Sequence, residues 1–307
     1  MFDELKQSYL KRSEFGLVLD WDFHRRNRWA SAYSHFLVEA IINAFDPVII
    51  SSQRQYDFHR KRLDCILSFE PGWAAPRIQY DSGCESLKAV MYSDPHYQPE
   101  ARSKYFTENG FDFVLSLYRA PFFQHFKGFP EEKFVHFPWA VPDCFVSELP
   151  VRVRSDEVVI FGGKASDAYD IRNWCRYQPG ITGYDYSGVE NKRLGNKEYY
   201  CWLENFDAII AAGSSKPIYN LVTPKYFEIP AAGALLVGQF CEDLEVLGFD
   251  ASNSLIFDPS EFLDKVDHYR RNPEAFLATR KRGRELIGSR HRLSDRISLL
   301  KRLFDGS

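Results

Sequence analysis

The chain has 307 residues, more than one domain usually contains, so we expect either one large domain or two domains of medium size. Hydrophobic residues make up 45% of the chain and charged residues 26%, and no apolar run approaches the roughly 20 residues of a transmembrane helix, which excludes such a helix. The net charge of −3 and the pI of about 6.3 exclude the strongly basic character of a general nucleic-acid binder.

The first residues and the cysteines indicate the compartment of the protein and whether metal or disulfide bonds hold it together. Residues 1–6 lack the apolar core of a signal peptide, which predicts a cytoplasmic protein. The cysteines are scattered and form no close pair, which argues against a structural zinc site and against a disulfide framework. They are Cys65, Cys84, Cys144, Cys175, Cys201 and Cys241.

Apolar runs in the first half of the chain predict strands that are joined by helical or loop segments. The predicted strands are residues 15–20, 47–51, 63–69, 88–93, 111–116 and 133–137. Residues 29–45 have apolar side chains at helical spacing and are predicted to form a helix, whereas residues 21–28 are expected to be a polar loop. Strands that alternate with such segments are typical of a mainly parallel, Rossmann-like sheet.

A stretch with two prolines at residues 138–143 breaks this pattern and is predicted to be a domain linker. The pattern restarts with a strand at residues 157–161, which runs into a glycine turn. Further strands are predicted at residues 181–183, 207–211 and 254–257, and helices at 168–177, 198–205, 259–270, 272–288 and 293–304.

Residues 223–238 predict a short helix, a glycine stop and a buried strand. Pro224 suits the first helical position, where its missing N–H costs nothing, and Gly233 suits the left-handed residue after a helix end. The apolar run at residues 234–237 is typical of a strand that is covered on both faces. Glu228 stands among apolar residues, so its carboxylate either caps or pairs within the fold, or it points into a cleft and binds hydroxyl groups.

Gly162 and Gly163 follow a predicted strand, and Lys164 comes next. Glycines let the backbone approach a phosphate, and the N–H groups of a following helix favour anions. A tight turn uses the same residues, so both interpretations stand. Lys225 lies three residues before Glu228 on one face of the predicted helix, so the two side chains either pair with each other or serve a ligand.

Two loops at the predicted carboxyl ends of strands each hold an aspartate and a histidine. Asp22 and His24 follow the first strand, and Asp94 and His96 follow a later one. Because ligands of open α/β sheets bind beyond the carboxyl ends of the strands, these side chains are candidates to bind a substrate hydroxyl or to act as a general base. The alternatives are a helix cap at Asp22 and a turn that Asp94 begins before Pro95.

The sequence Lys-Tyr-Phe-Glu-Ile-Pro-Ala-Ala-Gly at residues 225–233 resembles the donor-nucleotide motif of GT-B glycosyltransferases. It looks most like the glycosyl-transferase-group-1-like family, which includes the spore maturation protein B relatives. The resemblance covers roughly residues 155–300 and, more loosely, the whole chain. It implies an α/β protein of the GT-B fold, with two Rossmann-like domains that face each other across a cleft. The implied domains are an acceptor domain at residues 1–141, on which a C-terminal helix at 293–307 packs back, and a donor domain at residues 142–292.

The resemblance also implies roles for individual residues. Glu228 would hold the ribose hydroxyls of a nucleotide-sugar, and Gly162 and Gly163 would form the diphosphate loop. The candidate charge partners of the diphosphate are Lys164, Arg172 and Lys225. Retaining members of the fold often carry a second Glu beside the donor sugar, eight residues before the ribose Glu, and this chain has Asn220 there.

Together these signals indicate a glycosyltransferase, either a hexosyl- or a pentosyltransferase, that moves a sugar from a UDP-sugar to a glycan or small-molecule acceptor. The predicted donor half at residues 142–292 contains no Asp-X-Asp metal motif, so we expect a metal-independent reaction without a cofactor. One alternative is a bacteriophage-type DNA glycosyltransferase acting on modified bases, because residues 23–62 carry seven Lys or Arg against three acids. A second alternative is a non-catalytic nucleotide- or glycan-binding protein, since fold does not fix function.

Overall fold

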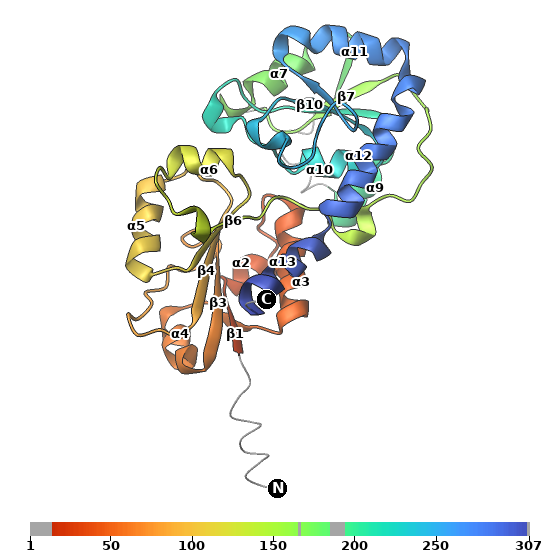
Figure 1. The fold of residues 1–307 in the computed structure, drawn as a ribbon. Helices are drawn as coiled ribbons and strands as arrows, with labels where there is room; N and C mark the ends of the chain where they lie inside the picture. The colour runs from red at the N-terminus through yellow and green to blue at the C-terminus, as the bar shows by residue number, and fades with distance from the viewer. Residues whose placement is uncertain (1–13, 165–166, 185–193, 306–307) are drawn as a thin grey trace. The chain divides into compact units, whose positions relative to one another are not determined.

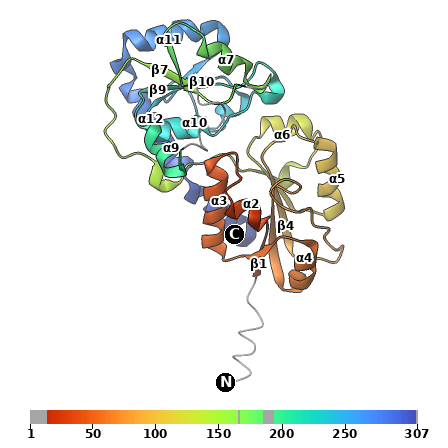
Figure 2. The same cartoon turned by 180° about the vertical axis from the view of Figure 1, so that it is seen from behind.

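The structure, a computed structural model, describes residues 14–164, 167–184 and 194–305. The chain divides into two compact units, each with a β-sheet that is covered by helices on both faces (Figures 1 and 2). The N-terminal unit comprises Met1–Trp29, Ser34–Pro138 and Leu299–Ser307, and the C-terminal unit comprises Ala30–Tyr33 and Trp139–Ser298.

The N-terminal sheet has parallel strands in the order β2-β1-β3-β4-β5-β6. They are β1 (Glu14–Val18), β2 (Val48–Ile50), β3 (Leu63–Phe69), β4 (Leu87–Tyr92), β5 (Phe113–Ser116) and β6 (Phe134–His136). Helices cover both faces of the sheet, and a strand with two covered faces reads as a continuous apolar run. For this reason the apolar runs in the sequence located all of these strands.

The connections in the N-terminal unit contain α2 (Trp21–Arg25), α3 (Ala32–Phe45), α4 (Gln53–His59), α5 (Pro99–Asn109) and α6 (Ala120–His125). The expectation of a loop over residues 21–28 is wrong for its first part. The Asp20 carboxylate accepts a hydrogen bond from the backbone N–H of Phe23 (3.0 Å) and thereby caps a short helix. The helix predicted from residue 29 begins only at Ala32, because Asn27 has a left-handed φ of +45° and the chain turns there.

The N-terminal unit includes residues from near the end of the sequence. Helix α13 (Leu293–Asp305) ends in this unit. The ring centre of Phe304 lies 4.9 Å from that of Phe15 on β1 and 6.3 Å from that of Phe45 on α3. Phe15 and Phe45 stack on each other at 4.6 Å. Three segments far apart in the sequence therefore share one aromatic cluster.

The C-terminal sheet has parallel strands in the order β11-β10-β9-β7-β8. They are β7 (Val158–Phe161), β8 (Ile181–Tyr184), β9 (Ala208–Ala211), β10 (Leu235–Gln239) and β11 (Leu255–Phe257). The helices are α7 (Asp170–Arg176), α9 (Asn196–Leu203), α10 (Lys225–Ala231), α11 (Phe262–Arg271) and α12 (Leu277–Arg290). Helices α11 and α12 begin later than predicted, because Pro259 and Pro273 each open a short 3-10 turn ahead of them.

The short helix, glycine stop and buried strand predicted around Glu228 are all present, as α10, Gly233 and β10. Gly233 has a φ of +80°, the left-handed conformation expected after a helix end. Pro224 lies one residue before α10 rather than at its first position. It already has helical dihedral angles, and its carbonyl accepts the first helical hydrogen bond, from the N–H of Glu228 (3.0 Å).

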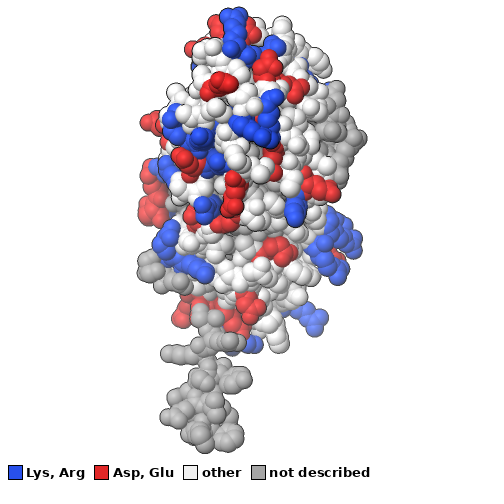
Figure 3. Space-filling view, turned by 90° about the vertical axis from the view of Figure 1, so that its right-hand side faces the viewer, with Lys and Arg blue, Asp and Glu red and all other residues white. Residues whose placement is uncertain are grey.

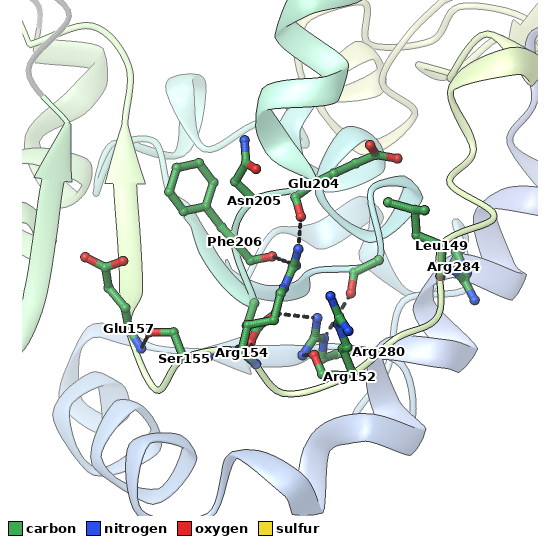
Figure 4. Close-up of polar contacts among 12 residues, drawn as sticks. Leu149, Arg152, Arg154, Ser155, Glu157, Glu204, Asn205, Phe206, Arg280 and Arg284 are labelled. Carbon is green, nitrogen blue, oxygen red and sulfur yellow. Dashed lines mark hydrogen bonds and ion pairs between the residues drawn. The ribbon is translucent and has the colours of Figure 1, made fainter.

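A buried ion network joins separate segments of the C-terminal unit (Figure 4). The Asp207 carboxylate, directly before β9, accepts hydrogen bonds at Oδ1 from Nε of Arg154 (3.0 Å) and from Nη2 of Arg280 (2.8 Å). Its Oδ2 accepts the backbone N–H groups of Arg154 and Ser155. Arg280, on α12, also donates to the carbonyl oxygen of Gly233 (2.9 Å). The network therefore fastens α12 and the segment before β7 to the start of the sheet.

Candidate functional site

The carboxyl ends of β7, β9 and β10 lie at one edge of the C-terminal sheet, because these neighbouring strands are parallel. Ligands of open parallel sheets bind at this edge. Gln239, the last residue of β10, connects it to the segment after β9. Its amide oxygen accepts the N–H of Gly213 (2.9 Å), and its amide nitrogen donates to the carbonyl of Ser214 (2.9 Å).

Two cationic side chains converge on Gly162, the first residue after β7. Gly162 has a φ of +114°, a conformation that favours glycine. A Cβ atom added there would lie 2.5 Å from Nζ of Lys225 and 3.0 Å from Nη1 of Arg172. The predicted glycine turn thus needs glycine both for its backbone conformation and for the close approach of the two cations.

Backbone carbonyl groups orient both cations. Nζ of Lys225 donates to the carbonyl of Phe161 (2.6 Å) and lies 3.8 Å from the centre of the Phe161 ring. Nε of Arg172 donates to the carbonyl of Ala212 (2.8 Å), and its guanidinium lies 4.2 Å from the centre of the Tyr169 ring. A carbonyl fixes the position of a cation without cancelling its charge, so both side chains bring positive charge to this edge of the sheet.

Arg176 is a third cation at this turn, and the sequence did not single it out. Its Nη2 donates to the carbonyl of Gly162 (2.8 Å), and its Nη1 donates to Oδ1 of Asn173 (2.8 Å). Asn173 in turn donates to the carbonyl of Lys164 (3.0 Å), so helix α7 fixes the whole glycine turn. The available signal was spacing, because Arg176 follows Arg172 by four residues and shares its helix face.

Glu228 is buried on α10, with 4% of its surface exposed. Its Oε2 accepts a hydrogen bond from the hydroxyl of Tyr199 on α9 (2.8 Å). Burial raises the pKa of Glu228 to about 7, although the Tyr199 bond, the positive charge of Lys225 and the nearby Tyr200 oppose the rise. Both the charged and the neutral carboxyl group are therefore populated near neutral pH. The two tyrosines were not recognised as neighbours of Glu228 from the sequence.

Asn220 lies in the loop before α10 and contacts the segment after β10. Its Nδ2 donates to the carbonyl of Phe240 (2.9 Å), and its Oδ1 accepts from Sγ of Cys241 (3.1 Å). The structure thus brings Asn220 to the same sheet edge as Gly162, Lys225 and the end of β10.

Asp22 and His24 both lie on α2 in the N-terminal unit, in different settings. Asp22 is exposed and pairs with Arg25 (2.9 Å). His24 is buried, with 1% of its surface exposed, and both ring nitrogens have partners. Nδ1 accepts from Nε1 of Trp29 (3.1 Å), so Nε2 carries the proton in the neutral ring and donates to Oε1 of Glu39 (2.8 Å).

Asp94 and His96 follow β4, as predicted. The Asp94 carbonyl accepts the N–H of Tyr97 (3.1 Å), which closes the turn expected before Pro95, while the Asp94 carboxylate is exposed. Burial lowers the pKa of the half-buried His96, against the opposing charge of Asp94. The imidazole is therefore neutral at physiological pH, the form in which a histidine accepts a proton.

Glu70, directly after β3, is an acid at the same sheet edge that the sequence did not single out. It is buried and has a left-handed φ of +55°. Its carboxylate accepts hydrogen bonds from the backbone N–H and the hydroxyl of Ser93. Burial raises the pKa of Glu70 to about 7, against the Ser93 bonds and the charge of Arg102. The usable signal was an acid that directly follows an apolar strand, whereas Glu228 stood out as an acid within a short apolar helix.

Charges of both signs are interspersed over the face shown in Figure 3. In the basic segment at residues 23–62, Arg25 pairs with Asp22, Arg60 with Asp81, and Arg62 with Glu14. These ion pairs reduce the local positive charge, and DNA as an acceptor is not supported.

No described helix is both long and apolar enough to cross a membrane. Within residues 14–164, 167–184 and 194–305, no group of three or more His, Cys, Asp or Glu side chains is placed to hold a metal ion.

A family model described as glycosyl transferase-like matches residues 147–302, just over half of the chain. The match includes the turn at Gly162, helix α7, and the α10–β10 unit with Glu228. No curated protein sequence matches the chain.

Several solved structures are similar in fold. Sucrose-phosphate synthase from Thermosynechococcus elongatus has 12% identity and a TM-score of 0.65, and the match covers 96% of this chain and 100% of that one. Anabaena HepE in complex with UDP-glucose has 9% identity and a TM-score of 0.64, with 97% and 100% coverage. TarM of S. aureus has 13% identity and a TM-score of 0.54, and the match covers 78% of this chain but only 54% of TarM. With the two parallel sheets, these likenesses confirm the predicted GT-B fold of two Rossmann-like domains.

Proposed function

Because the chain belongs to the glycosyl transferase-like family, we propose that it moves a sugar from a UDP-sugar to a glycan or small-molecule acceptor. The observation that carries the proposal is the convergence of Lys225 and Arg172 on the backbone of Gly162. The structure of HepE, which shares the fold, contains UDP-glucose, which supports the choice of donor. Within the family, the motif at residues 225–233 supports kinship with the spore maturation protein B relatives.

On the donor side, the diphosphate is proposed to lie over Gly162 and Gly163. Negative charge builds on the diphosphate as the sugar leaves, and cations that are already in place stabilise that charge. The proposed cations are Lys164, Arg172, Arg176 and Lys225. They support a reaction without a metal ion or other cofactor, because they supply the positive charge that a metal would otherwise supply.

Glu228 and Asn220 are assigned to the rest of the donor. Glu228 would accept hydrogen bonds from the ribose hydroxyls in its charged form, which its pKa of about 7 makes available at neutral pH. Asn220 would lie beside the sugar, since its loop is joined to the segment after β10. The donor domain in this proposal is residues 142–292.

We assign the acceptor to the domain at residues 1–141, on which the C-terminal helix would pack. Among the four candidates there, the exposed carboxylate of Asp94 and the neutral imidazole of His96 suit a base better than His24 does. Both ring nitrogens of His24 already have hydrogen-bond partners, so we assign a structural role to His24 and Asp22, which hold the segment around α2 in place.

Thermal unfolding with UDP-, GDP-, ADP- and dTDP-sugars tests the proposal. A bound donor at 100 times its Kd should add about 2.7 kcal/mol of stability, and the UDP-sugars should give the largest shift. Release of UDP in the presence of an acceptor then separates an enzyme from a non-catalytic binding protein. A chain that binds none of these donors would refute the proposal.

A matched pair of variants tests the diphosphate assignment. Lys225→Met keeps the length of the side chain and removes its charge, so it should weaken UDP much more than uridine. Lys265→Met is the control, because Lys265, on α11, pairs with Glu261 (2.7 Å) and donates to Ile256 of β11, which β10 and β9 separate from β7. Equal losses for UDP and uridine in Lys225→Met would show that Lys225 serves only the fold.

A further inference from the structure

Three exposed aromatic side chains follow three neighbouring strands of the N-terminal sheet. Trp21 follows β1, Trp73 follows β3 and Tyr97 follows β4, and these strands are adjacent in the order β1-β3-β4. Trp21 is 41% exposed, Trp73 is 52% exposed and Tyr97 is 57% exposed. Large aromatic side chains are mostly buried in folded proteins, so a group of exposed ones at one sheet edge marks an interaction surface.

Hydrogen bonds fix the first two of these loops to each other. The backbone N–H of Asp20, the residue before Trp21, donates to the carbonyl of Ala74, the residue after Trp73 (2.8 Å). The Trp73 ring also packs edge-on against the ring of Trp29, with 5.7 Å between the ring centres. The two tryptophans therefore stand on a rigid part of the fold and not on free loop tips.

The third loop is fixed to the same support. Glu70, in the turn that carries Trp73, accepts the N–H of Ser93, in the loop that carries Tyr97 (2.5 Å). The Tyr97 ring has the guanidinium of Arg102 5.5 Å from its centre, and Arg102 is itself buried. The three segments that carry the aromatic side chains are thus joined to one another at the carboxyl edge of the sheet.

The polar groups between the aromatic side chains point to the kind of ligand. Asp20 and Asp22 flank Trp21 at the start of α2, Asp94 lies in the loop of Tyr97, and all three are exposed. A sugar ring has an apolar face of C–H bonds that stacks on an aromatic ring, and hydroxyl groups at its edge that donate to carboxylates. The same carboxylates repel phosphate groups, which disfavours a nucleic acid as the ligand.

We propose that Trp21, Trp73 and Tyr97 form a stacking surface for an oligosaccharide acceptor. The inference rests on the proposed function and makes its acceptor a glycan of several sugar rings. The three loops follow strands that span about 10 Å across the sheet, at about 4.8 Å per strand. A single sugar ring is too small to contact all three side chains, whereas a chain of two or three rings reaches them.

Binding of the full chain to an array of immobilised neutral oligosaccharides, followed by titration of the best ligand, tests the inference. Trp21→Ala and Tyr97→Ala should each weaken binding at least about tenfold. Trp73→Phe should retain most of the affinity, because phenylalanine keeps both a stacking face and the packing against Trp29. Phe58→Ala is the control, because Phe58 is 79% exposed but lies at the end of α4, before β3 begins at the opposite edge.

The outcomes separate this inference from the proposed function. If no oligosaccharide on the array binds, or if the Trp21 and Tyr97 variants bind as tightly as the Phe58 control, the inference is overturned. Tighter binding of single-stranded DNA through the same side chains would overturn it too. UDP-sugar binding is measured on the same preparations. Glycan binding without donor binding would refute the proposed function and leave the stacking surface standing.

Discussion

Replacement of Asp207 by asparagine should strongly destabilise the C-terminal unit. Both carboxylate oxygens of Asp207 act only as acceptors: Oδ1 accepts from Arg154 and Arg280, and Oδ2 accepts two backbone N–H groups. Asparagine has the same shape, but in either orientation its NH2 group faces donors at one of these positions. The substitution also leaves Arg280, which is 2% exposed, without its charged partner.

The expected cost follows from these losses. Breaking a buried ion pair by removing one partner costs about 3–5 kcal/mol, because the remaining charge stays buried. For a unit of this size, 1 kcal/mol lowers Tm by about 2–4 °C, so the Asp207→Asn variant should lose roughly 6–20 °C. Asp156→Asn is the matched control, because Asp156 pairs with Arg270 at 3.9 Å on the surface and such pairs contribute about 0–1 kcal/mol.

Calorimetry of both variants measures the shift, and hydrogen exchange of peptides from β9 and α12 locates it in the C-terminal unit. A Tm within about 2 °C of the wild-type value for Asp207→Asn would refute the reasoning.

The same network predicts an acid dependence. Burial alone would raise the pKa of Asp207, but the N–H groups of Arg154 and Ser155 and the charge of Arg280 hold it below its usual value. An acid whose pKa is lower in the folded state contributes stability above its unfolded pKa of about 3.9 and loses it as the pH falls through the folded value. Between pH 5 and pH 2, the free energy of unfolding should therefore fall less in Asp207→Asn than in wild type, because the variant lacks this carboxylate.

Two predictions concern the donor site. Gly162→Ala should weaken UDP at least about tenfold and uridine little, because its Cβ would displace Lys225 and Arg172; calorimetric titration with both ligands checks this, and equal losses would contradict it. Uridine affinity should rise with pH through about 7, where Glu228 ionises and becomes a stronger acceptor for the ribose, and Glu228→Gln should bind weakly at every pH. A pH-independent wild type would contradict the ribose role.

The parts of the fold that the sequence predicted well are those in which one local signal decides the structure. The apolar run at residues 234–237 can only be buried, and β10 is buried along its whole length. Gly162 and Gly233 stand where the backbone needs positive φ, and both turns were expected there. Both sheets could therefore be predicted, because buried parallel strands and glycine turns each leave a clear local signal in the sequence.

The parts that the sequence did not predict depend on contacts between distant segments. Tyr199 reaches Glu228 from another helix, 29 residues away in the sequence, and Glu70 accepts from Ser93, which follows the neighbouring strand β4. Arg176 could be placed on the face of Arg172, but only the register of α7 against β7 shows that it donates to Gly162. Helix α2 was not predicted, because its stability comes from one cap at Asp20 and not from a periodic pattern of apolar residues.

The aromatic cluster of Phe15, Phe45 and Phe304 determines when the N-terminal unit can complete its folding during translation. A ribosome that has delivered residue 138 has made every strand of the N-terminal sheet, yet Phe304 is still 166 residues away. At about 5–20 residues per second, the nascent sheet waits roughly 10–30 s with Phe15 and Phe45 uncovered. The half that is translated first is thus completed last. A gene cut at the linker would yield an N-terminal fragment without its own cover, and a permuted gene that places residues 299–305 before residue 14 would supply it from the start.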